Sequence, residues 1–263
     1  MSADKETPVG GSKEGCSVED ILTGLSIHNG DFADFSGRKN NVWLGVSISL
    51  KPYSEELARK YLKTAVQCSR ERALVLIADE IASINYRVLG GYSDRKSLEK
   101  ALERGDSFAE RYRKFVGELL PADRCRVEVV RWRDVWEGQQ RERYEVLKEE
   151  YFSNPDFRDV VESPVITYLA NSARTIKPSR VDKMADYILR ELPSLLEGVE
   201  YKGMQYKTMF YPTYGKTSLG RVVEGIQRGE LFHGLKEKLG LTGDHVLVDS
   251  LIPGSGKGVL DGC

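Results

Sequence analysis

The stretch Asn41 to Ser54, NVWLGVSISLKPYS, decides the fold that we predict for this chain. Its apolar part, Val42 to Ser49, is short and rich in β-branched residues, which favours a strand covered on both faces, as in a parallel sheet. Lys51-Pro52 ends the strand, so the run closes in a bend that carries Ser47 and Ser49. If this bend serves a reaction, Ser47 is the first candidate for its nucleophile.

A helix and a second buried strand follow the bend. Ser54 can cap the helix, whose apolar residues recur at helical spacing as far as Cys68. Ala73 to Asp79, ALVLIAD, is again fully apolar, so residues 42 to 79 form one predicted βαβ unit with a parallel sheet. Ligands of such sheets bind beyond the carboxyl ends of the strands, where both Ser47 and Asp79 would lie.

The rest of the chain continues the alternation of strands and helices. Further strands are predicted over Arg126 to Trp132, Gln205 to Tyr211 and His245 to Ile252, and further helices over Ser97 to Leu120, Arg133 to Tyr151, Asp156 to Ala173, Arg180 to Leu192 and Leu219 to Leu239. We therefore expect an α/β fold, a single Rossmann-like domain with a mostly parallel sheet of at least five strands, over residues 21–263. Residues 1–20 are expected to be a flexible tail.

Three helix breaks are expected from glycine and proline. Gly105-Asp106 should interrupt the helix over Ser97 to Leu120, because Ser107 and Glu110 form a capping box after it. Pro164 should kink or divide the helix in which it lies, and Pro193 should end the helix that begins at Arg180.

Composition excludes several classes of protein. The chain has 263 residues with 40% apolar and 30% charged residues, which is typical of a soluble domain that can bury a core. The four cysteines and three histidines are dispersed without metal-ligand spacing, so neither structural zinc nor a disulfide framework is expected. No apolar run reaches the roughly 20 residues that span a bilayer, and the N-terminus lacks the apolar core of a signal peptide. We expect a cytoplasmic protein.

Two segments resemble known catalytic or phosphate-binding motifs, but each lacks a glycine that its motif requires. Gly215-Lys216-Thr217-Ser218 resembles the end of a phosphate loop, but Phe210 stands where the first glycine should be. Ser47 lacks the second flanking glycine of a nucleophile elbow. A Ser-His-Asp hydrolase stays open because histidines are present, although no spacing selects one of them. A serine at a strand end more often lines a pocket or caps a helix than attacks a substrate.

The helix beginning at Arg180 carries an unusual carboxylate. Its apolar stripe predicts a core-facing side, and Tyr187 and Glu191 fall together on the flank of that stripe. Glu191 is therefore predicted to lie at the edge of the core. A structural arginine partner is the ordinary explanation for such a carboxylate, and an acceptor for a substrate ammonium group is the functional one.

The helix over Ser97 to Leu120 carries a cluster of cations at Arg104, Arg111, Arg113 and Lys114. A solvated helix face is the more common explanation for such a cluster. A track for nucleic-acid phosphates is the alternative. With a net charge of −1, the chain can hold a polyanion only through a local patch of this kind.

The chain resembles the tRNA-dependent cyclodipeptide synthases in three segments that occur in the same order. They are Gly45-Val46-Ser47 after a buried strand, Tyr187 to Glu191 on a helix, and Phe210-Tyr211-Pro212 at a late strand end. The resemblance spans roughly Val42 to Pro212, and its specificity lies in the combination. It implies a Rossmann-type domain similar to the catalytic domain of class I aminoacyl-tRNA synthetases, without ATP activation and without a cofactor or metal. Leu50 and Tyr211-Pro212 resemble the X-Tyr-Pro branch, whereas the other branch has Asn and Tyr-His there.

The resemblance also implies roles for individual residues. Ser47 would be the nucleophile that takes an aminoacyl group from a first charged tRNA and then carries aminoacyl and dipeptidyl esters. Tyr187 and Glu191 would hold the ammonium group, and Tyr211 would assist proton transfer during ring closure to the diketopiperazine. An aminoacyl-tRNA ester is already activated, so positioning matters more than a strong base.

Further residues would contact the substrate in such an enzyme. The pocket for the first aminoacyl side chain would be lined by Trp43, Gly45, Leu76, Ser194 and Met209, and the acceptor arm of tRNA would meet Arg104, Arg111, Arg113 and Lys114. The expected partners are aminoacyl-tRNAs, with no membrane, and the expected state is a monomer. The alternatives are a noncatalytic tRNA-binding module of synthetase-like fold and a serine hydrolase.

Overall fold

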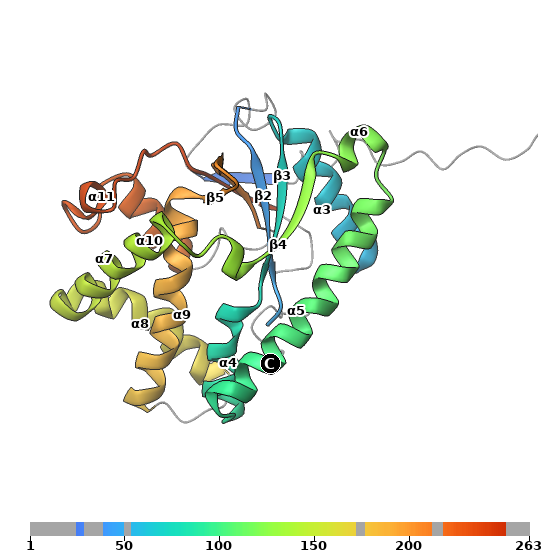
Figure 1. Cartoon of the computed structure of the whole chain (residues 1–263). Helices are drawn as coiled ribbons and strands as arrows, with labels where there is room; N and C mark the ends of the chain where they lie inside the picture. The colour runs from blue at the N-terminus through green and yellow to red at the C-terminus, as the bar shows by residue number, and fades with distance from the viewer. Residues whose placement is uncertain (1–24, 29–38, 50–53, 172–176, 212–217, 251–263) are drawn as a thin grey trace, which may run out of the picture.

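The computed structural model describes residues 25–28, 39–49, 54–171, 177–211 and 218–250 (Figure 1). The predicted tail over residues 1–20 lies outside these ranges, as do Leu50 and Pro212. No helix within the described ranges is long and apolar enough to cross a membrane.

A six-stranded sheet runs through the centre of the molecule. Its strands lie in the order β1-β8-β7-β2-β3-β4, and only β1 is antiparallel to its neighbour. Their bounds are Leu25–His28 (β1), Val42–Ser47 (β2), Ala73–Ala78 (β3), Val127–Arg131 (β4), Thr208–Phe210 (β7) and Val246–Ser250 (β8). Counted along the chain, the five parallel strands have the Rossmann order 3-2-1-4-5, so the topological switch point lies between β2 and β7.

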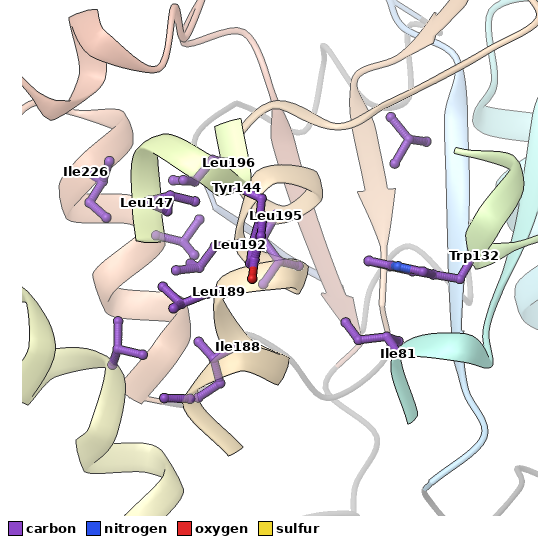
Figure 2. Packing of buried hydrophobic residues seen from close by; sticks show 14 of the residues in the cluster. Ile81, Trp132, Tyr144, Leu147, Ile188, Leu189, Leu192, Leu195, Leu196 and Ile226 are labelled. Atoms are coloured by element: carbon purple, nitrogen blue, oxygen red, sulfur yellow. The ribbon is translucent and has the colours of Figure 1, made fainter. Parts of the chain in front are cut away.

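Helices cover both faces of this sheet (Figure 1). One face packs against α3 (Glu55–Cys68) and α5 (Asp94–Gly117). The other packs against a layer made by α7 (Gln139–Ser153), α8 (Pro155–Asn171), α9 (Pro178–Glu197) and α10 (Ser218–Gln227). Figure 2 shows Leu189, Leu192 and Leu195 of α9 beside Tyr144 and Leu147 of α7.

Short elements make the connections. They are η1 (Glu80–Ala82), α4 (Ser83–Gly90), α6 (Pro121–Arg124), η2 (Trp132–Asp134), the hairpin of β5 (Val199–Tyr201) with β6 (Met204–Tyr206), and α11 (Leu235–Lys238). Of these, η1 and α4 follow directly from the carboxyl end of β3 and lie against α9 and α5.

The predicted βαβ unit is confirmed. β2 and β3 are neighbours in parallel register, and every β2 residue from Val42 to Val46 is buried. Ser54 caps α3, where its side chain accepts a hydrogen bond from the Leu57 N–H at 3.2 Å. The predicted apolar stripe of α9 is also buried: Val181, Met184, Ala185, Ile188 and Leu192.

The predicted break at Gly105-Asp106 is wrong, because α5 is one continuous helix. Gly105 lies against a buried ion pair between Asp79, after β3, and Arg131, at the end of β4. Asp106 also pairs with Arg131, and Arg131 donates to the Leu102 carbonyl at 3.1 Å. The two residues that looked like a helix break are therefore the place where α5 docks on the sheet.

Proline does not divide the two helices in which breaks were expected. α8 continues through Pro164, and α9 continues through Pro193 to Glu197. Residues 192–197 of α9 are all buried. The packing energy of this last turn and a half exceeds the roughly 3 kcal/mol that an interior proline costs.

Three other predicted boundaries are also corrected. The strand predicted over Gln205 to Tyr211 is interrupted at Lys207, so β6 belongs to the hairpin and β7 to the main sheet. The helix predicted over Leu219 to Leu239 is divided into α10 and α11 by a segment with Gly229 and Gly234 in left-handed conformations. Residues 132–134 form η2, so α7 begins only at Gln139.

Gly105→Ala should destabilise the fold, because an added Cβ would lie 2.6 Å from Asp79 Cβ and 2.7 Å from its Oδ2. Overpacking of this kind costs about 1–3 kcal/mol, against a gain in helix propensity of up to ~1 kcal/mol. Urea denaturation should show the loss. Gly117→Ala, on the same helix with no atom within 4 Å of the added Cβ, is the matched control and should lose nothing. Equal midpoints for the two variants would contradict this account.

Candidate active site

Ser47 is the last residue of β2 and lies at the switch point of the sheet. Strand residues alternate between faces, so Ser47 shares its face with Trp43, which packs on the α9 side. Its Oγ accepts a hydrogen bond from the Ser49 N–H at 3.3 Å, and its hydroxyl is hydrogen-bonded to Tyr187. The serine that the sequence analysis selected therefore lies at the carboxyl ends of the parallel strands, where α/β proteins bind ligands.

Tyr187 and Glu191 come from successive turns of α9; Tyr187 contacts Ser47, and Glu191 lies near Tyr187. Both are surrounded by protein atoms while a part of their surface stays accessible. Burial raises the pKa of Tyr187 well above its ordinary value, and the nearby Glu191, Tyr211 and Tyr168 raise it further. Burial alone raises the pKa of Glu191 to about 7. Among the described residues, no cation contributes to that shift, so none of them acts as a structural arginine partner for this carboxylate.

Tyr211 reaches the same place from β7, on the other side of the switch point. Its backbone N–H donates to the Val248 carbonyl at 3.0 Å, which fixes the chain just after the strand. Its ring lies over Gly45, where an added Cβ would be 2.9 Å from Tyr211 Cδ2 and 3.2 Å from Met209 Cε. Gly45 is therefore needed for the tyrosine ring to approach β2.

Four of the five residues predicted for a side-chain pocket lie on one sheet face. Trp43 is opposite Met209 in the β2–β7 register, and Gly45 is opposite Leu76 in the β2–β3 register. The fifth, Ser194, lies one turn after Glu191 and donates its hydroxyl to the Glu191 carbonyl at 2.8 Å. Ser194 is 2% exposed, so it is enclosed within α9's packing.

Two polar residues of this region were not predicted. Tyr168 of α8 is close enough to Tyr187 to raise its pKa, so a third tyrosine borders the site. Asn85 of α4 donates from Nδ2 to Ser49 Oγ at 3.0 Å. No motif or spacing marks either residue, because each reaches the site through the packing of a helix distant in sequence.

The histidines do not approach Ser47. His245 immediately precedes β8 and His28 pairs with Leu247, so both lie at the amino edge of the sheet, opposite the edge that holds Ser47. His245 is fully buried beside Gln227, its pKa lowered to about 3, chiefly by burial. His233 is exposed in the segment between α10 and α11. In the part of the chain that the structure describes, no Ser-His pair is formed.

The cations of α5 are divided between two flanks. At 3.6 residues per turn, Arg104, Arg111 and Lys114 fall with Lys96 and Lys100 within an arc of about 80°. We call this group the basic flank. Arg113 and Arg95 project from the other side of the buried stripe, next to Glu99, Glu103, Asp106 and Glu110. Three of the four predicted tRNA contacts therefore share one surface, and Arg113 stands apart from them.

A cavity of about 860 Å³ opens on the far side of α9, between α7 and α8. Three of its charged groups have protein partners: Glu162 accepts from Tyr151, Asp186 from Tyr144 and Arg190, and Arg158 donates to two carbonyls. These three groups need no ligand. Among the described residues, no cluster of three or more His, Cys, Asp or Glu side chains could hold a metal ion.

Comparison with solved structures identifies the fold. A cyclodipeptide synthase from Bacillus thermoamylovorans superposes with a TM-score of 0.68 over 88% of this chain and 97% of its own, at 15% identity. A cyclodipeptide synthase from Fluoribacter dumoffii gives a TM-score of 0.64 over 85% and 96%, at 14% identity. A Mycobacterium tuberculosis protein gives 0.63 over 86% and 92%, at 18% identity. That structure is described as demonstrating that cyclodipeptide synthetases are related to type I tRNA synthetases.

Sequence comparison adds no relative. No protein-family model matches the chain, and no curated protein matches it. At identities of 14–18%, the structural likeness is a likeness of fold. The chain has the Rossmann-like fold of the cyclodipeptide synthases, with Ser47, Tyr187, Glu191 and Tyr211 gathered at its switch point.

Proposed function

We propose that this chain is a cyclodipeptide synthase of the X-Tyr-Pro branch, which joins the aminoacyl groups of two aminoacyl-tRNAs into a 2,5-diketopiperazine. The observation that carries the proposal is the contact of Ser47 with Tyr187, beside a buried Glu191 and Tyr211. The group comes from β2, α9 and the end of β7. A shared fold alone would not require these side chains to meet.

In the first step, the Ser47 hydroxyl attacks the ester carbonyl of one aminoacyl-tRNA. The bond to the terminal ribose breaks, the tRNA leaves with a proton on its hydroxyl, and the aminoacyl group stays on Ser47. Tyr187 and Glu191 hold the substrate ammonium group during this attack. No cation in the described part of the chain neutralises the Glu191 carboxylate, and a buried carboxylate in that state favours a substrate cation over water.

In the second step, the amino group of the Ser47 ester attacks the ester of the second aminoacyl-tRNA, which releases that tRNA and gives a dipeptidyl ester. The new terminal amine then attacks the Ser47 ester, closes the ring and frees the serine. Tyr211 assists proton transfer at this stage. Each attack needs a neutral amine, and Glu191, with a pKa of about 7, is matched to accept a proton from an ammonium group near neutral pH.

The pocket for the first aminoacyl side chain would be the sheet face between β3 and β7. Trp43, Gly45, Leu76 and Met209 line that face, and Ser194 supports it from α9. Because Gly45 has no side chain, the Tyr211 ring and Met209 cover this part of the sheet face and form the bottom of the proposed pocket. The proposed pocket is mainly apolar.

The basic flank of α5 would hold the tRNA acceptor arm. Arg104 and Lys114 are exposed there, and Arg111 stacks over the Phe115 ring with 5.5 Å between its Cζ and the ring centroid. A row of cations along one helix flank follows a phosphate backbone without reading its sequence. Arg113 falls on the other side of α5, among its acidic residues, so we assign the contact to the basic flank: Arg104, Arg111 and Lys114 with Lys96 and Lys100.

The alternatives make different predictions. A noncatalytic tRNA-binding module would use the same basic flank but would never form an ester on Ser47. A serine hydrolase would need a histidine at Ser47, and the described histidines lie elsewhere.

Ser47→Ala should abolish formation of any cyclic dipeptide from charged tRNAs and should remove the covalent aminoacyl adduct, because the nucleophile is gone. Mass spectrometry of the product and of the intact protein measures both. Ser153→Ala, an exposed serine on α7, is the control and should retain both. Wild-type protein that binds charged tRNA but gains no adduct would favour the binding-module alternative.

Glu191→Gln should slow single-turnover acylation of Ser47 by about 10- to 100-fold, the worth of a charge-assisted hydrogen bond of ~1.5–3 kcal/mol. In the wild type, acylation should increase as the pH rises through about 7, where Glu191 loses its proton. The variant should lack that step. Glu149→Gln, on the exposed side of α7, should keep it. A wild-type profile in Glu191→Gln would overturn the ammonium role.

Glu191→Gln should lower activity but raise the stability of the fold. The folded pKa of Glu191 is raised from 4.5 to about 7, so its contribution to stability is lost as the pH rises through this interval. Glu191→Gln should therefore gain more thermal stability over the wild type at pH 8 than at pH 4.5. Thermal unfolding at the two pH values measures the difference, and an equal gain at both would mean that Glu191 is not a buried carboxylate.

Arg104→Gln/Lys114→Gln should weaken tRNA binding and lower the slope of log Kd against log salt by about two units, because each phosphate contact contributes roughly one. Arg95→Gln/Arg113→Gln removes the same charge from the other flank and is the matched control. Its slope should change by less than half as much. Filter binding over a salt series compares them, and equal losses would show that the helix acts only through its net charge.

A further inference from the structure

The bend after β2 is connected to α4 by a short chain of hydrogen bonds. The Ser49 N–H donates to Ser47 Oγ at 3.3 Å, and Asn85 Nδ2 donates to Ser49 Oγ at 3.0 Å. The first of these is long for an N–H···O bond, so on its own it holds Ser47 loosely. The second hydrogen bond attaches Ser49, which supplies that N–H, to the neighbouring helix α4.

Asn85 is carried to this position by the strand beside β2. Ser47 is opposite Ala78, the last residue of β3, and η1 and α4 follow β3 with only Asp79 between. Ile84 and Val88 of α4 are buried, which fixes the helix against the core and turns Asn85 toward the bend. The amide therefore approaches Ser49 from a rigid element and not from a loop.

The Asn85 amide is not explained by stability. Its Oδ1 is buried and has no hydrogen-bond partner among the residues that the structure describes. An unpaired buried acceptor is unfavourable, so an apolar residue of similar size would suit the fold at least as well. A polar residue that lowers stability and contacts the bend next to Ser47 indicates a role in the reaction.

We propose that Asn85 is a positioning residue for Ser47 and acts through Ser49. The inference rests on the proposed function and deepens it. Asn85 fixes the Ser49 side chain, Ser49 directs its N–H at Ser47 Oγ, and the Ser47 hydroxyl is left to bond Tyr187. One lone pair of Oγ then remains for the ester carbonyl. The Asn85 amide on α4 thus holds the bend that contains Ser47 and Ser49.

The direct test compares Asn85→Leu with Ser83→Ala, a half-buried serine on the same helix. Leucine has the same number and branching of side-chain heavy atoms as asparagine and lacks both the donor and the acceptor. Single-turnover acylation of Ser47 should fall by about 10- to 100-fold in Asn85→Leu, the usual effect of a misplaced reacting group. The Kd for charged tRNA should stay within about twofold, and the melting temperature should not fall, because the unpaired acceptor is removed. Ser83→Ala should match the wild type.

A double-mutant cycle tests the route through Ser49. If Asn85 acts only by holding Ser49, then Asn85→Leu should slow acylation in the wild type but cause little further loss in a Ser49→Ala background. If the two substitutions slow acylation independently, so that their effects multiply in the double variant, the proposed route through Ser49 is wrong. A loss of acylation that follows a loss of thermal stability, or wild-type acylation in Asn85→Leu, would overturn the positioning role.

The outcome can be separated from that of the proposed function. If the wild-type protein forms no ester on Ser47, the proposed function fails. If the wild type forms the ester and Asn85→Leu forms it at the same rate, only this inference fails. Crystal structures of the two proteins give a readout that needs no activity: Ser47 Oγ should move away from the Ser49 N–H in Asn85→Leu, and an unchanged bend would contradict the proposal.

Discussion

The buried ion pair of Asp79 and Arg131 holds the carboxyl edge of the sheet together. Asp79 has no exposed side-chain surface and follows β3, and Arg131 ends β4. The Asp79 carboxylate also accepts from the Trp132 N–H at 3.2 Å, and Arg131 reaches Asp106 and the Leu102 carbonyl on α5. Loss of one partner of such a pair costs about 3–5 kcal/mol, because the other charge stays buried. The pair thus fixes α5 and the start of η1, and through η1 it fixes α4.

This one constraint positions both parts of the molecule to which the proposed function assigns contacts with tRNA. α5 docks through Gly105, which leaves its basic flank on the outside of the molecule. α4 presents Asn85 to the bend that carries Ser47. The proposed binding surface and the proposed nucleophile therefore depend on the same buried charges, although they lie on different elements.

α9 has two functions in the same twenty residues. Its buried stripe forms the core with α7, α8 and α10, and its flank offers Tyr187 and Glu191 to the switch point. In the proposed function the rigidity of the buried part matters for this flank, since a substrate ammonium group would have to be held at a fixed distance from Ser47. The cost is a carboxylate whose pKa is raised to about 7 by burial. Perturbed pKa values of this kind cluster at functional sites.

The sequence by itself determined the βαβ unit over residues 42–79, the mostly parallel sheet and the edge position of Glu191, because strand burial and helix periodicity are local properties. The order of three short motifs also identified Ser47, Tyr187, Glu191 and Tyr211 as candidate site residues. The tertiary structure decided the rest. Gly105 can lie inside a helix because Asp79 and Arg131 occupy the space of its side chain. Pro193 can lie inside α9 because the residues after it are buried. Asn85 reaches Ser49, and Arg113 is separated from Arg104, only through the packing of whole helices, which no local pattern encodes.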